Sequence, residues 1–138
     1  MPQTRAPGRI YLRIVGVWCL LAGLLTVFTS LMGLAIAEST LWMLYNFVTF
    51  SVAALYFFTG IMALKYSGVL EQANTLRTFA FLNIGIEVFF FAFNVLALGI
   101  SAVGITLLLG LIRPFVYLYG ATKNKNAIPH ISDDSTIE

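Results

Sequence analysis

The chain has few charged side chains and very few of the residues on which most enzymes depend. Only 10% of its 138 residues are Asp, Glu, Lys or Arg, and it has one cysteine, Cys19, and one histidine, His130. A single cysteine excludes an intramolecular disulfide, and the single histidine lies outside the apolar segments, so no Ser–His or Cys–His pair exists inside them. No glycine-rich phosphate-binding loop is present. Ordinary hydrolytic and phosphoryl-transfer chemistry lacks its usual residues, and no cofactor is expected.

Apolar sequence takes the place of these residues. Hydrophobic residues make up 59% of the chain, and the mean hydropathy is +0.90. Four apolar stretches are each close to the ~20 residues that an α-helix needs to cross a bilayer, and they cover residues 14–37, 41–64, 78–98 and 102–121. Because the connections are short, these stretches predict an all-α integral membrane protein, a single four-span antiparallel helix bundle over 14–121.

The basic residues predict the orientation of this bundle. They occur before the first span, between the second and third, and after the fourth, as Arg5, Arg9, Arg13, Lys65, Arg77, Lys123 and Lys125. The other two connections contain Glu38 and no Lys or Arg. The positive-inside rule therefore places both termini in the cytoplasm, with residues 1–13 as a basic cytoplasmic segment and 122–138 as a polar, disordered tail. A cell inner or plasma membrane is favoured over an organelle membrane.

The positive charge has a second interpretation, a basic patch for nucleic acid or lipid headgroups. Topology explains the same residues more simply, so no nucleic-acid partner is expected. The first span also has an alternative, because Ala35-Ile36-Ala37 before Glu38 resembles a signal-peptide cleavage site. The apolar run is longer than the ~7–15 residues of a signal peptide, which favours a retained span.

Small and polar residues follow one face of each span at steps of three and four. The third span gives the clearest example, with Ala80, Asn83, Glu87, Phe90, Asn94 and Ala97. The opposite faces are mostly Leu, Ile, Val and Phe. In lipid, small residues let helices approach closely and polar residues find partners in other helices, so this pattern predicts an interior lined by the small and polar faces. The spacing favours left-handed packing at shallow angles.

Two opposite charges lie inside the third and fourth spans. Glu87 is nine residues from the cytoplasmic end of its span and Arg113 is eight residues from the same end of the next span. An isolated charge in the membrane costs several kcal/mol, roughly 2.5–3.5 on insertion scales, so we expect the two to pair. The pair has two interpretations: it fixes the register of the helices, or it also handles a proton, an ion or a ligand.

Other candidate site residues are placed by the same counting. Tyr56, Thr26 and Asn83 are expected close to the charge pair, and Pro114 is expected to kink the fourth span. A second polar layer nearer the outer face is expected to contain Ser30, Asn46, Thr49, Asn94 and Thr106. These groups either hold the helices together or line a pathway. His130, Asp133 and Asp134 are a weak pattern for metal binding, and no metal site is expected.

Two fragments carry a loose resemblance to a known family. RTFAFLNIGIE (77–87) and GLIRPFVYLYG (110–120) resemble two helices of the MAPEG family, which are four-span enzymes and lipid-binding proteins that use glutathione. The Asn83-to-Glu87 spacing is four where the family usually has three. The fragments also fall in the third and fourth spans, not the second and third, and they cover less than a fifth of the chain. The resemblance assigns no residue a role.

Three function classes follow. The first is an accessory or assembly subunit of a larger membrane complex, or a homo-oligomer, whose partners are other membrane proteins or its own copies within the lipid bilayer. The second is a small transporter or channel for a proton, ion or small solute that uses Glu87 and Arg113. The third is a membrane-embedded enzyme or lipid-binding protein.

Overall fold

Every regular element of the protein is a helix in the part of the chain that the structure describes. The computed structural model describes residues 6–99 and 104–128, without the side chains of 98 and 104–109. Its elements are α1 (Arg9–Ala35), α2 (Thr40–Tyr66), a short 3-10 helix η1 (Leu70–Gln72), α3 (Ala73–Leu98) and α4 (Gly104–Asn126). Among the described residues, α1, α2 and the segment Leu70–Ala97 are long and apolar enough to cross a membrane. The predicted membrane protein is therefore supported by three helices, and the fourth span stays a prediction.

All four helices extend beyond the predicted spans at the end of the bundle that carries the basic residues. α1 begins at Arg9, and α4 continues to Asn126, five residues past the predicted end of its span at 121. Residues 122–126, assigned above to a disordered tail, are therefore helical. Low hydropathy ends an apolar stretch without ending its helix, and Lys123 and Lys125 in the last turn favour the helix through its dipole. The remainder of the predicted tail, from 129 onward, lies outside the described residues.

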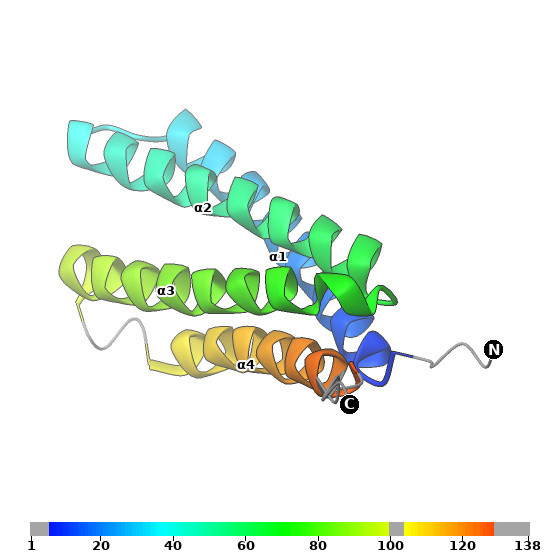
Figure 1. Cartoon of the computed structure of the whole chain (residues 1–138). Helices are drawn as coiled ribbons and strands as arrows, with labels where there is room; N and C mark the ends of the chain where they lie inside the picture. Colours follow the sequence, from blue (N-terminus) through cyan, green and yellow to red (C-terminus); the bar gives the residue numbers. More distant parts are fainter. Residues whose placement is uncertain (1–5, 100–103, 129–138) are drawn as a thin grey trace, which may run out of the picture.

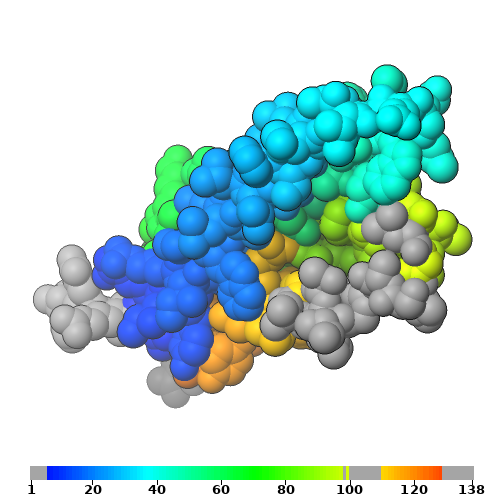
Figure 2. All heavy atoms as spheres, turned by 180° about the vertical axis from the view of Figure 1, so that it is seen from behind, coloured from blue at the N-terminus to red at the C-terminus, as the bar shows by residue number. Residues whose placement is uncertain are grey.

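The helices form two hairpins that converge at one end. Figure 1 shows α1 with α2 and α3 with α4, and the two pairs diverge away from the end where α1 begins and α4 finishes. Figure 2 shows the molecule from behind, with the α1–α2 connection far from the end of α4. We call the converging end, which carries Arg9, Arg13, Lys65, Arg77, Lys123 and Lys125, the basic end. We call the other end the opposite end.

Glycines allow the backbones of α1 and α2 to touch along the first hairpin. A Cβ built on Gly60 would lie 2.9 Å from the Gly16 carbonyl oxygen, and one built on Gly23 would lie 3.3 Å from the Ala53 carbonyl oxygen. Gly33 similarly faces the Asn46 side chain. Close approach through small residues is the usual way in which helices pack in lipid, and it gives the predicted small-residue faces of both spans a place in the interior.

The hydrophobic core is larger near the basic end. One buried cluster takes residues from all four helices, namely Leu12, Val15, Cys19, Ala63, Leu76, Ala80, Tyr117 and Ala121. A second cluster contains Val52, Tyr56 and Ile86 from α2 and α3 alone. Packing that involves all four helices is therefore concentrated near the basic end.

Candidate functional site

Glu87 of α3 and Arg113 of α4 form a buried ion pair. The contact joins Nη2 of Arg113 to Oε1 of Glu87, and both side chains are more than nine-tenths buried. The two residues meet because consecutive antiparallel helices carry them at the same depth. Counting along the spans predicted this pair. No second ion pair is found among the described residues.

Tyr56 of α2 completes this layer. Its hydroxyl donates a 2.9 Å hydrogen bond to Oε1 of Glu87, and the Arg113 guanidinium carbon lies 3.8 Å from the centre of its ring. Tyr56 therefore stabilises the carboxylate with a hydrogen bond and the guanidinium with a cation–π contact. We call Tyr56, Glu87 and Arg113 the pair layer.

The other carboxylate oxygen of Glu87 faces the backbone of α4. A Cβ built on Gly110 would lie 3.0 Å from Oε2 of Glu87, so a glycine at this position lets the carboxylate approach the helix. Pro114 lies four residues further on, and proline gives the Gly110 carbonyl no backbone N–H to bond. The helix continues unbroken through Pro114, which is buried, so the predicted kink produces no break in α4.

A second polar layer lies one turn closer to the basic end. It contains Thr59, Asn83 and Tyr117, one residue from each of α2, α3 and α4, and we call it the Tyr117 layer. The Tyr117 hydroxyl donates to the Thr59 carbonyl at 3.3 Å, and the Thr59 hydroxyl lies 3.4 Å from the Asn83 amide oxygen. The Asn83 amide nitrogen donates to the carbonyl of Phe79 in its own helix. Asn83 was predicted near the pair, whereas the bonding of Thr59 and Tyr117 was missed.

Among the described residues, helix α1 contributes no hydrogen bond to the pair layer. The hydroxyl of Thr26, predicted near the pair, donates instead to the carbonyl of Ala22 at 2.7 Å. Gly23, one turn before Thr26, leaves no open space beside the charges, because a Cβ built on it would meet the Phe57 ring and the Ala53 carbonyl at 3.3 Å.

The predicted outer layer does not form a network between helices. The side chains of Ser30, Asn46, Thr49 and Asn94 each donate to a carbonyl four residues earlier in their own helix. One bond between helices occurs here, from the Tyr45 hydroxyl to Asn94 Oδ1 at 2.7 Å. Tyr45 was not among the predicted members of this layer. The side chain of Thr106 lies outside the described residues.

A buried asparagine connects three segments at the basic end. Asn124 of α4 accepts a 2.6 Å hydrogen bond from the backbone N–H of Gly8 and donates a 3.0 Å bond to the carbonyl of Ser67, which follows α2. Gly8 also touches the backbone of Gly120. We call Gly8, Ser67 and Asn124 the Asn124 clasp. Sequence reasoning missed it, because Asn124 stands in a polar stretch that resembles a tail.

Two surface hollows in the described part of the chain are lined by neither residue of the charge pair. One lies between α1 and α4 near the basic end, and the other is lined by α1 and α2 at the opposite end. Within the same residues no group of three His, Cys, Asp or Glu side chains could hold a metal. His130, Asp133 and Asp134 lie outside the described residues.

Comparison with known proteins finds no match to this chain. No protein-family model matches the chain, and neither a curated protein nor a solved structure matches it. The loose resemblance to the MAPEG family therefore gains no support from these comparisons.

Proposed function

We propose that the protein is a four-span membrane protein with both termini in the cytoplasm, and that it acts by association, as an accessory or assembly subunit or as a homo-oligomer. Three apolar helices support the membrane location, and α4 packs against α3 through Glu87 and Arg113 as a fourth span would. The basic residues gather at one end of the bundle, which the positive-inside rule assigns to the cytoplasmic face. A cell inner or plasma membrane is the proposed location.

The main support for the proposal is that the Glu87 carboxylate is enclosed by contacts within the chain. One carboxylate oxygen contacts both Arg113 and Tyr56, and the other faces Gly110. Neither of the two surface hollows described above, within the described residues, is lined by Glu87. A group that transfers a proton or binds a solute needs access to water or to that solute. A carboxylate enclosed in this way is suited to fixing the register of α2, α3 and α4.

The outer surface supports association. Ser51 and Ala54 are exposed on α2, and Gly85 is exposed on α3 with no atom within 4 Å of a Cβ built on it. Small residues on an outer face of a membrane helix allow a second helix to approach closely. These residues are not needed for packing within the chain, so they are available for contacts outside it.

Native mass spectrometry in a mild detergent tests this proposal. We expect the full-length chain to appear with further copies of itself or with other polypeptides. A bare monomer under conditions that preserve known complexes from the same membrane would contradict the proposal. The intact mass also tests the signal-peptide alternative, because a chain beginning at Glu38 would have lost α1.

Transport is a second candidate because of one observation. In the described part of the chain, Nε of Arg113 is buried with no hydrogen-bond partner, so one donor of the pair layer is available to a proton carrier or ligand. Liposome flux measured with Glu87→Gln tests this candidate. Loss of flux at unchanged protein abundance would support transport, whereas an equal loss of abundance would support the structural role.

A further inference from the structure

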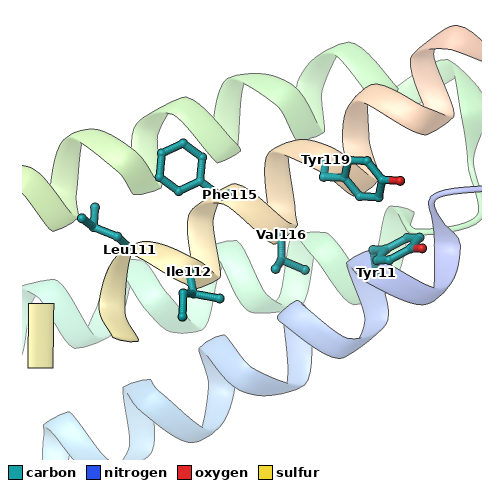
Figure 3. A pocket seen from close by; sticks show the side chains of 6 residues that line it. All are labelled: Tyr11, Leu111, Ile112, Phe115, Val116 and Tyr119. Carbon is teal, nitrogen blue, oxygen red and sulfur yellow. The ribbon is translucent and has the colours of Figure 1, made fainter. Parts of the chain in front are cut away.

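An apolar groove lies between the beginning of α1 and the outer face of α4. Its volume is about 400 Å³, and it is lined by Tyr11, Leu111, Ile112, Phe115, Val116 and Tyr119. Figure 3 shows Tyr11 and Tyr119 side by side at one end of the groove, with both hydroxyls turned toward the basic end. Apolar side chains line the remainder.

The length of the groove matches one leaflet of a bilayer. Leu111 and Tyr119 are eight residues apart on α4, which is about 12 Å at ~1.5 Å per residue. Half of a hydrocarbon core of ~30 Å is about 15 Å. The groove therefore extends from near the proposed cytoplasmic interface most of the way to the membrane midplane, the depth that one acyl chain occupies.

A cation stands at the end of the groove that lies nearest the cytoplasm. The Lys123 ammonium lies 5.1 Å from the ring centre of Tyr11 and 5.0 Å from that of Tyr119, and the two rings pack edge to face at 5.0 Å. Lys123 lies beyond the predicted span, where a lysine with its ordinary pKa is charged at neutral pH. Hydrogen bonding with Tyr119 raises this pKa further. No carboxylate of the described residues pairs with Lys123.

We propose that this groove binds an anionic phospholipid of the cytoplasmic leaflet, with one acyl chain along α4 and the headgroup phosphate beside Lys123. Charge complementarity selects this occupant: the leaflet on that side carries the anionic lipids, and basic sites between membrane helices bind their headgroups. The two tyrosines hold the ammonium at the interface, where amphipathic rings are favoured. The proposal rests on the four-span orientation given above.

The experiment compares retained lipid among matched variants. Protein purified in detergent is mixed with phosphatidylglycerol or phosphatidylcholine of identical acyl chains, and the lipid-bound fraction is measured by native mass spectrometry. We expect phosphatidylglycerol to be preferred and Lys123→Gln to lower its retention roughly fivefold, the ratio given by about 1 kcal/mol for one basic residue. Lys125→Gln removes the same charge from an exposed position two residues further along α4, on another side of the helix, and should leave retention unchanged.

A second pair of variants tests the acyl-chain portion. Ile112→Trp fills the groove, whereas Ile61→Trp enlarges an equally exposed isoleucine on α2, so only the former should reduce retention. Equal binding of the two lipids, or an equal effect of the two lysine variants, would overturn the proposal. So would the loss of a dimer in Ile112→Trp at unchanged lipid retention, because the groove would then be a contact between copies.

Membrane insertion is measured on the same variants by alkaline carbonate extraction. Release of the chain into the soluble fraction would contradict both the four-span proposal and the lipid site. A chain that stays in the membrane pellet but shows no lipid preference would contradict the lipid site alone.

Discussion

The two halves of the bundle satisfy their polar side chains in different ways. From the pair layer to the basic end, polar groups bond from one element to another: Tyr56 to Glu87, Glu87 to Arg113, Tyr117 to Thr59, and Asn124 to both Gly8 and Ser67. In the opposite half, the described Ser, Thr and Asn side chains mostly bond to carbonyls of their own helices, and Tyr45 to Asn94 is the bond between helices.

This difference explains the shape of the molecule. A hydroxyl or amide that bonds to the carbonyl four residues earlier is satisfied, but it does not fix the position of a neighbouring helix. The opposite half therefore depends on the glycine contacts of the α1–α2 hairpin and on Tyr45, and the two hairpins diverge there (Figure 1). The basic half sets the register of the bundle, and we expect local opening to begin in the opposite half.

The largest effect is expected from breaking the ion pair in the basic half. Arg113→Leu leaves the Glu87 carboxylate buried with Tyr56 as its remaining partner, and removal of one member of a buried pair costs about 3–5 kcal/mol. The free energy of unfolding would be measured by SDS titration followed by circular dichroism. The double variant Glu87→Leu with Arg113→Leu should recover most of the loss, and a double variant as unstable as the single one would show that packing, not charge, is responsible.

Asn124→Ala is expected to have the next largest effect. It leaves the Gly8 N–H and the Ser67 carbonyl without their partner, and each unsatisfied buried group costs ~1–3 kcal/mol. Because water reaches the end of the bundle more easily than its centre, we expect a total loss of about 2 kcal/mol. Asn126→Ala, an exposed position on the same helix, should change stability by less than ~0.5 kcal/mol. Equal effects of the two variants would show that the Asn124 clasp does not stabilise the basic half.

The pair layer was predictable from sequence because lipid penalises isolated charges so strongly. Glu87 and Arg113 are the only charged residues deep inside the apolar stretches, and equal depth in consecutive antiparallel spans leaves them one another as partners. The same counting placed Tyr56 correctly beside them. The helical class followed from composition, and three apolar helices in the structure support it. The small-residue faces followed from periodicity, and the glycine contacts between α1 and α2 support them there.

The remaining contacts were not predictable for two physical reasons. Ser, Thr and Asn can always bond to a nearby carbonyl of their own helix, so their presence on one face does not show that they connect helices; the outer layer of Ser30, Asn46, Thr49 and Asn94 was overestimated on this account. Asn124 lies in a polar segment at the membrane surface, where a polar side chain is satisfied by water, so its sequence position does not require a protein partner. Its partner Gly8 is 116 residues away, and only the folded chain brings the two together.

A smaller effect is expected at the opposite end from Tyr45→Phe. The variant keeps the stacking of the ring on Phe93, whose centre lies 5.6 Å away, and loses the hydrogen bond to Asn94. A single hydrogen bond contributes about 1 kcal/mol, so we expect a loss of that size in the free energy of unfolding. Hydrogen exchange should accelerate in the first half of α2. Unchanged exchange there would show that this bond does not hold the two hairpins together.

The smallest difference between a variant and its control is expected for two threonines on the same helix. Thr59 and Thr49 are both buried, and each hydroxyl bonds to the carbonyl four residues earlier, but Thr59 alone also approaches a neighbouring helix, at Asn83. Replacement by valine keeps the shape and removes the hydroxyl. We expect Thr59→Val to lower the free energy of unfolding by about 1 kcal/mol, because the Asn83 oxygen loses its contact, and Thr49→Val to change it by less than ~0.5 kcal/mol. If SDS titration shows the same loss in the free energy of unfolding for both variants, the contact between helices adds nothing beyond the bond within α2. The two halves of the bundle would then differ in geometry and not in stability.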